Sequence, residues 1–206
     1  MKNMFKDAII LFIITLIAGA ALGFVYNITK EPIAQAEAKA LEDAYKEVFA
    51  AADHFDELDS FQNPKEGAAG EWIDNGFENV DVNTALKAMD STGQFLGYVI
   101  KLTTHEGYGG DIVFTMGITG DGTINGISIL SISETAGLGM RAEEVLKPQY
   151  ADKKTTAFTV TKTGATSESQ IDAISGATIT SNALTNAVNG GLYYFETALG
   201  GGMNEG

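Results

Sequence analysis

The chain of 206 residues contains no cysteine, and this absence excludes several classes of site at once. Disulfide bonds, thiolate metal centres and iron–sulfur clusters all need cysteine, and so does the lipid anchor of a lipoprotein. If the protein takes part in redox chemistry, a bound organic group must therefore supply the redox-active atoms.

Positive charge and histidine are also scarce. Thirteen Lys and Arg residues oppose 27 Asp and Glu residues, the formal net charge is −14, and Arg141 is the only arginine. An acidic surface repels nucleic acid and anionic lipid, so we expect neither as a partner. His54 and His105 have no second candidate ligand at metal-binding spacing, and we therefore predict no metal site.

One long uncharged run lies near the N-terminus. Residues 8–26, AIILFIITLIAGAALGFVY, contain no charged side chain. At about 1.5 Å per residue, a helix of this length just crosses a hydrocarbon core of ~30 Å, which predicts a transmembrane anchor. The alternative is a cleaved signal peptide, whose apolar core is usually shorter. Lys2 and Lys6, in a tail of residues 1–7, predict a cytoplasmic N-terminus and a single span, with everything beyond it outside the cytoplasm.

The pattern beyond the anchor changes from helical to β. Residues 27–57 predict a helical connector broken near Pro32, and residues 59–79 predict a loop in which Trp72 is a packing residue. Two hairpins follow, pairing residues 82–89 with 95–103 and residues 112–118 with 124–130. A strand over residues 158–162 and a C-terminal helix come next. We therefore expect an α+β fold, an antiparallel sheet with packed helices, over residues 58–200, and a flexible tail over residues 201–206.

The stretch 172–180, DAISGATIT, places a small-residue turn at the start of that C-terminal helix. The first backbone N–H groups of a helix lack intrahelical partners and lie at the positive end of its macrodipole. An anion such as a phosphate is therefore favoured there. The alternative is that Ser175, Thr178 and Thr180 only cap the helix.

The spacing of this stretch resembles the motif D-x-x-[ST]-G-A-[TA]-x-T of the FMN-binding domain family. The resemblance implies that Thr180 carries FMN through a phosphoester bond, within a site that also holds Asp172, Ser175, Gly176, Ala177 and Thr178. It further implies an external, magnesium-dependent FMN transferase that uses FAD as donor, because an unactivated threonine hydroxyl is a poor nucleophile. A near-copy, TGAT at residues 163–166, has Val160 in the Asp position and Glu168 in the acceptor position.

Two glycine-rich loops add to this site. Residues 107–110, GYGG, join the two hairpins, and their glycines let Tyr108 and Gly109 approach a planar ligand closely. Residues 134–139, ETAGLG, resemble the ETPGLG loop that lies against the flavin in the same family, with Ala136 in place of proline. The resemblance adds Glu134, Thr135, Gly137, Leu138 and Gly139 to the cofactor site.

Arg141 directly follows the second loop and has two interpretations. It supplies positive charge to the FMN phosphate or the flavin ring, or it pairs with Glu143 or Glu144 on the surface. The first interpretation makes it a cofactor-binding residue.

The order of anchor, external domain and C-terminal motif resembles the G subunits of Rnf electron-transport complexes. The resemblance implies an FMN-carrying relay in a complex that moves electrons between ferredoxin and NAD and couples this transfer to ion transport. Its partners would be the other membrane subunits and the ferredoxin- and NAD-reacting subunits, and alone it need catalyse no net reaction. Three alternatives remain: the C subunit of a sodium-translocating NADH:quinone reductase, a stand-alone anchored flavin carrier, and an anchored binding module without a redox role.

Overall fold

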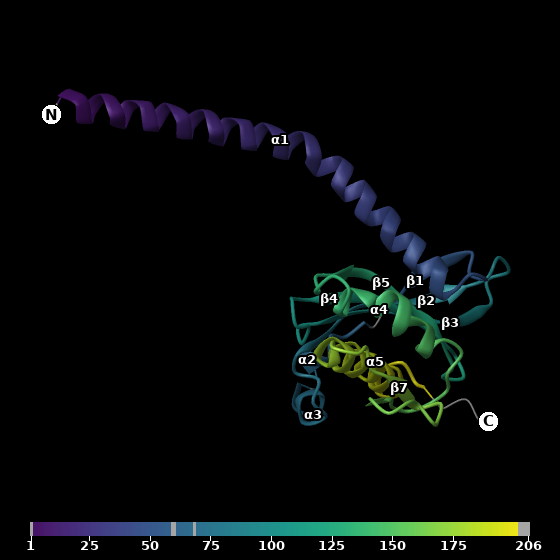
Figure 1. Ribbon diagram of the computed structural model, residues 1–206. Coiled ribbons are helices and arrows are strands. Elements are labelled where there is room, and N and C mark those ends of the chain that lie inside the picture. The colour runs from purple at the N-terminus through teal and green to yellow at the C-terminus, as the bar shows by residue number, and fades with distance from the viewer. Residues whose placement is uncertain (1, 59–60, 68, 202–206) are drawn as a thin grey trace. The chain divides into compact units, whose positions relative to one another are not determined.

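The N-terminal helix α1, Lys2–Val48, opens the computed structural model, which describes residues 2–58, 61–67 and 69–201 (Figure 1). The chain divides into two compact units, Met1–Glu42 and Asp43–Gly206. The first unit contains a stretch apolar and long enough to cross a membrane, and its large side chains, such as Leu11 and Phe12, are exposed. Exposed side chains of this kind suit contact with lipid.

Two expectations for the connector are wrong. The helix runs through Pro32 without ending, because proline removes only one hydrogen bond of a long ladder. It then stops at Val48, well before residue 57, and residues His54–Glu57 form strand β1 instead. Phe55 pairs with Ala88 of the neighbouring strand, so sheet hydrogen bonds replace helical ones there.

The second unit is built on a five-stranded antiparallel meander. Its strands are β1, β2 (Val80–Met89), β3 (Phe95–Thr104), β4 (Ile112–Thr119) and β5 (Ile124–Ile132), and each pairs with the next along the chain. The two predicted hairpins are confirmed. The α+β expectation is confirmed as well, since helices cover this sheet (Figure 1).

Helix α5, Thr178–Ala198, packs against the sheet along most of its length. Gly191 makes this possible, because a Cβ there would lie 2.7 Å from Met116 Cε and 2.9 Å from Leu102 Cδ1. The predicted loop before β2 contains two short helices, α2 (Pro64–Gly67) and α3 (Ala69–Asp74), so that expectation is wrong. Trp72 of α3 is 1 % exposed and donates its Nε1 hydrogen to Val80 O at 3.1 Å, which confirms its packing role.

The segment between β5 and α5 is irregular and carries most of the site. It contains η1 (Gly139–Arg141), α4 (Ala142–Val145) and η2 (Lys147–Tyr150), followed by β6 (Thr159–Thr161) and β7 (Gln170–Asp172). The strand expected near residue 158 is confirmed as β6, but it pairs in parallel with β7, outside the meander. Strand β7 leads directly into the turn before α5.

Candidate functional site

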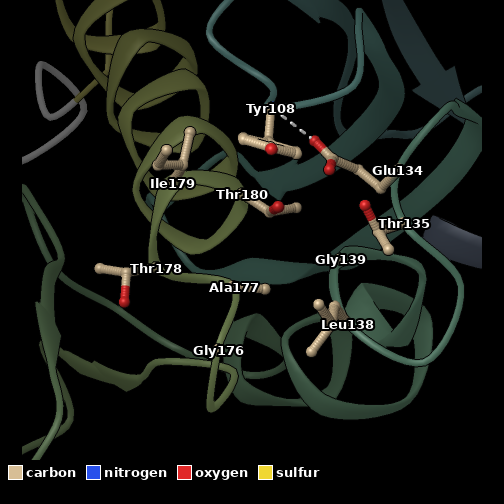
Figure 2. A pocket seen from close by; sticks show the side chains of 10 residues that line it. All are labelled: Tyr108, Glu134, Thr135, Leu138, Gly139, Gly176, Ala177, Thr178, Ile179 and Thr180. Atoms are coloured by element: carbon tan, nitrogen blue, oxygen red, sulfur yellow. Dashed lines mark hydrogen bonds between the residues drawn. The ribbon is translucent and has the colours of Figure 1, made fainter.

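A cavity of about 530 Å³ lies where three distant segments meet. They are the loop after β3, the loop after β5 and the first turn of α5 (Figure 2). Pockets of this size are typical of small-molecule and cofactor sites. The cavity is lined by Tyr108, Glu134, Thr135, Leu138, Gly139, Gly176, Ala177, Thr178, Ile179 and Thr180.

The first turn of α5 faces this cavity without a side-chain cap. Gly176, at φ +81°, turns the chain into the helix, and Ala177 at the N-cap offers no capping side chain. Within the described part of the chain, the hydroxyls of Ser175, Thr178 and Thr180 form no hydrogen bond. The helix-capping alternative is therefore wrong, and the backbone N–H groups of the first turn remain available to an anion.

The hydroxyl of Thr180 differs from those of its neighbours in the helix. Thr180 is 1 % exposed, and Ser181 and Thr185 are buried as well. These two, however, donate their hydroxyl hydrogens to Ala177 O at 2.9 Å and to Ser181 O at 2.8 Å. The residue four positions before Thr180 is Gly176, which precedes the helix and provides no such carbonyl. The Thr180 hydroxyl is consequently left facing the cavity.

Close packing at Gly139 brings the loop after β5 against Thr180. A Cβ at Gly139 would lie 2.7 Å from Thr180 Oγ1 and 2.7 Å from Glu134 Cβ, closer than real Cβ contacts. Any larger residue would fill the space in front of the hydroxyl. Glycine at this position therefore keeps the hydroxyl accessible from the cavity.

Glu134 joins the two loops that form the other wall. Its Oε1 accepts a hydrogen bond from the backbone N–H of Tyr108 at 2.7 Å (Figure 2). Tyr108 itself is 70 % exposed, and Ile179 and Leu138, which also line the cavity, are exposed as well. The rim is thus apolar, whereas the floor at the helix start is polar.

Most of the residues expected at the site line this cavity, and five do not. Asp172 lies in β7, where its backbone N–H donates to Gln149 Oε1 at 2.7 Å and its backbone O accepts from Gln149 Nε2 at 3.1 Å. Ser175 is exposed in the turn. Gly109 packs on Ser133, whose O would lie 2.1 Å from a Cβ there, and Gly137 adopts φ +76° in the loop. Asp172, Gly109 and Gly137 thus act on the backbone of the segments around the cavity, through hydrogen bonds, close packing and a positive φ.

Arg141 is the fifth residue outside the lining. Its Nε lies 3.9 Å from Glu144 Oε2, and its side chain is 44 % exposed. This geometry favours the surface ion pair. Ile179, in contrast, lines the cavity although sequence analysis did not single it out. The signal in the sequence was its place between Thr178 and Thr180, and the structure leaves this apolar side chain 54 % exposed.

The near-copy of the motif lies elsewhere. Residues 163–166 are exposed in the connection between β6 and β7 and do not begin a helix. This segment shares only GAT with residues 176–178, and it lacks the helix start that places those residues in the cavity wall.

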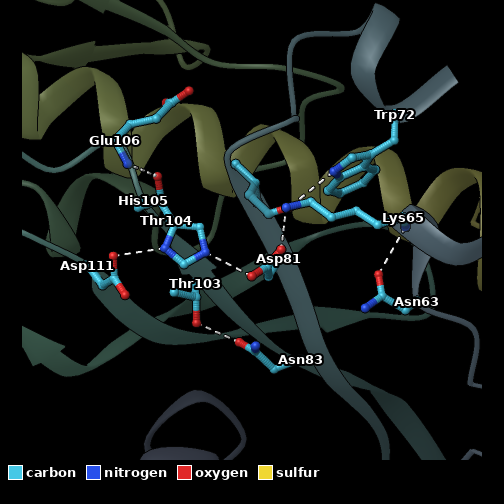
Figure 3. A network of polar contacts seen from close by, with 11 residues as sticks. Asn63, Lys65, Trp72, Asp81, Asn83, Thr103, Thr104, His105, Glu106 and Asp111 are labelled. Atoms are coloured by element: carbon cyan, nitrogen blue, oxygen red, sulfur yellow. Dashed lines mark hydrogen bonds and ion pairs between the residues drawn. The ribbon is translucent and has the colours of Figure 1, made fainter. Parts of the chain in front are cut away.

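A polar network fixes the base of the loop that carries Tyr108 (Figure 3). His105 Nδ1 lies 2.8 Å from Asp111 Oδ1 and His105 Nε2 lies 2.9 Å from Asp81 Oδ2. Hydrogen bonds to Asp81 and Asp111 raise the pKa of His105. Partial burial alone would raise the pKa of Asp81, but hydrogen bonds from Lys65 and His105 outweigh burial and lower it. The two ends of the loop are thereby held together.

The residues present fit a flavin mononucleotide. The open start of α5 suits a phosphate, the space kept by Gly139 admits it to the Thr180 hydroxyl, and the apolar rim of Leu138 and Ile179 suits a flat ring. The cavity volume is also sufficient for such a ligand.

Known proteins resemble both parts of the chain. Residues 107–193 match the FMN-binding domain family, and residues 1–48 match the RnfG N-terminal region. The crystal structure of NqrC from Shewanella oneidensis aligns with 57 % of this chain and 58 % of its own, with a TM-score of 0.47 and 22 % identity.

Two curated relatives align with nearly the whole chain. The G subunit of the Na(+)-translocating ferredoxin:NAD(+) oxidoreductase complex of Acetobacterium woodii is 31 % identical over 95 % of this chain and 93 % of its own. The G subunit of the proton-translocating ferredoxin:NAD(+) oxidoreductase complex of Clostridium ljungdahlii is 31 % identical over 90 % of this chain and 88 % of its own. With its anchor helix and its FMN-binding domain, the chain belongs to the family of G subunits of ion-translocating oxidoreductase complexes.

Proposed function

We propose that this chain is the electron-transfer subunit of a membrane-bound ferredoxin:NAD oxidoreductase complex coupled to ion translocation, and that it relays electrons through FMN attached covalently to Thr180. One observation carries the proposal. Thr180, whose residue as a whole is 1 % exposed, presents a hydroxyl without a hydrogen-bond partner among the described residues to a cavity of cofactor size at an open helix start. FMN supplies the redox chemistry, while the chain binds it, orients it and sets its potential.

The geometry supports a phosphoester at Thr180 in particular. A phosphate bonded to Oγ1 lies at the start of α5, where backbone N–H groups and the helix dipole stabilise negative charge. In a chain of net charge −14, such a fixed backbone site compensates for the scarcity of basic side chains. We assign the flavin ring to the space bordered by Tyr108, Leu138 and Ile179.

Attachment requires a second protein. We propose an FMN transferase that delivers the FMN part of FAD to Thr180, so this chain is the substrate of that reaction. The covalent bond would prevent loss of the cofactor from a domain facing the outside. The other subunits of the complex are the partners during electron transfer.

We also propose a single span with the N-terminus in the cytoplasm and the FMN domain outside it. The basic residues before the apolar run support this orientation. Since the chain lacks cysteine, one introduced cysteine reports its own location. In intact cells, a membrane-impermeant maleimide should label Ser91→Cys in the exposed turn after β2 and should not label Asp7→Cys. The reverse labelling would overturn the orientation.

The attachment is tested by in-gel flavin fluorescence after denaturing electrophoresis, with each chain co-expressed with an FMN transferase. We expect a fluorescent band for the wild type and for Thr178→Val, and none for Thr180→Val. If fluorescence disappears only in Thr178→Val, the hydroxyl that carries the flavin is that of Thr178 and not that of Thr180. A dark wild-type band beside an active transferase would favour the binding-module alternative.

A further inference from the structure

Two oxygens without a hydrogen-bond partner in the described part of the chain face the same gap at the bottom of the cavity. The position of a Cβ on Gly139 lies 2.7 Å from Thr180 Oγ1 and 2.8 Å from Glu134 Oε2. The separation of these oxygens cannot exceed the sum of the two distances, about 5.5 Å. One bridging water spans such a gap, and a small side-chain rotation shortens it. Figure 2 shows both side chains directed toward this space from opposite walls.

The carboxylate of Glu134 is unusual for a site that receives a phosphate. Its Oε1 accepts the backbone hydrogen of Tyr108, while among the described residues no Lys, Arg or His forms an ion pair with it. A negative charge beside an anionic ligand opposes binding. A glutamine would serve anion binding better and could accept the Tyr108 hydrogen as well, so neither role requires an acidic side chain at this place, whereas proton transfer does.

We propose that Glu134 is the proton acceptor for the Thr180 hydroxyl when the flavin is attached. The inference rests on the proposed attachment at Thr180. Thr180 Oγ1 attacks the phosphorus on the FMN side of FAD, the new O–P bond forms, and the bond to the AMP phosphate breaks. AMP leaves, and the hydroxyl proton passes to Glu134 Oε2, directly or through one water. No oxidation or reduction accompanies this step.

The test compares initial rates of attachment to the purified full chain in detergent, with transferase, Mg²⁺ and FAD. Glu134→Gln keeps a carbonyl oxygen that can accept the Tyr108 hydrogen but cannot accept a proton. We expect it to be labelled ~10² times more slowly than the wild type, which is a typical contribution of a positioned base. If the effect were only electrostatic, removing a negative charge beside anionic FAD would accelerate labelling. The sign of the change therefore separates the two explanations.

Controls separate this proposal from the proposed function. Glu106→Gln removes one charge from the neighbouring loop that carries Tyr108, at a side chain that contacts Asn186 and does not line the cavity, and should be labelled at the wild-type rate. Noncovalent FMN should bind Thr180→Val/Glu134→Gln at least as tightly as Thr180→Val, because the substitution removes a negative charge beside the phosphate. If the wild type is labelled and Glu134→Gln reacts as fast, Glu134 is not the acceptor and Thr180 attachment stands. If the wild type is never labelled, the proposed attachment itself fails.

Discussion

Replacing Gly139 by alanine should separate attachment of the flavin from folding of the domain. The added Cβ would lie 2.7 Å from Thr180 Oγ1 and 2.7 Å from Glu134 Cβ. Reaching an ordinary contact of ~3.5 Å requires the loop and helix to move apart by about 0.8 Å. Overpacking of this kind costs about 1–3 kcal/mol of stability. A displacement approaching 1 Å at a reacting oxygen costs ~10²-fold in rate, so attachment to Gly139→Ala should slow by that factor.

Gly117→Ala is the matched control. Its Cβ would lie 2.7 Å from Val48 O and 2.8 Å from Val48 Cβ, a similar overlap on strand β4, and Gly117 does not line the cavity. Both variants should lower the midpoint temperature of thermal unfolding. At an assay temperature below both midpoints, where both variants are folded, only Gly139→Ala should slow labelling by transferase and FAD. Equal labelling rates for the two variants would refute the argument that Gly139 keeps the Thr180 hydroxyl accessible.

Three further predictions concern the surrounding structure. Tyr150→Phe removes a buried hydrogen bond of 2.7 Å to Thr185 Oγ1 and should cost about 1 kcal/mol, seen as a lower thermal midpoint; an unchanged midpoint contradicts this. His105 has a raised pKa, so its ion pairs stabilise the fold fully below the unfolded value of 6.5 and lose this contribution as pH rises through the folded pKa. His105→Gln should therefore destabilise more at acid than at alkaline pH, by less than about 1 kcal/mol because the ring is 41 % exposed. Arg141→Gln should leave the flavin midpoint potential unchanged, whereas a shift would return Arg141 to the site.

Local patterns predicted the elements that begin or turn at a clear sequence signal. The hairpin of β4 and β5 follows from alternating apolar residues around Asp121-Gly122, and Gly122 has the positive φ, +87°, that such a turn requires. The start of α5 follows from the small residues before Thr178 and the three- and four-residue spacing after it. In each case the signal and the structure lie within a few neighbouring residues.

Contacts between distant segments decided what the sequence did not predict. Helix α3 forms where Trp72 is buried against Phe77, and β7 is three residues long and depends on pairing with β6. The site residues divide in the same way. The motif around Thr180 predicted the side of the cavity formed by the start of α5, whereas Arg141, interpreted either as a cofactor contact or as a surface pair, lies outside the lining, 3.9 Å from Glu144.

The backbone amides in the two walls of the cavity, helix α5 and the two loops, should exchange their hydrogens with solvent on different timescales. Amides of α5 between Ala183 and Phe195 lie in a stretch whose side chains, such as Leu184 and Val188, are mostly buried, and they should exchange with solvent only when the whole domain unfolds. The loops that carry Tyr108 and Leu138 are largely solvent-facing and should exchange through local openings. If FMN is attached to Thr180 as proposed, its attachment point on α5 would stay fixed through repeated encounters, while the mobile loops beside its ring would adapt to each neighbouring subunit.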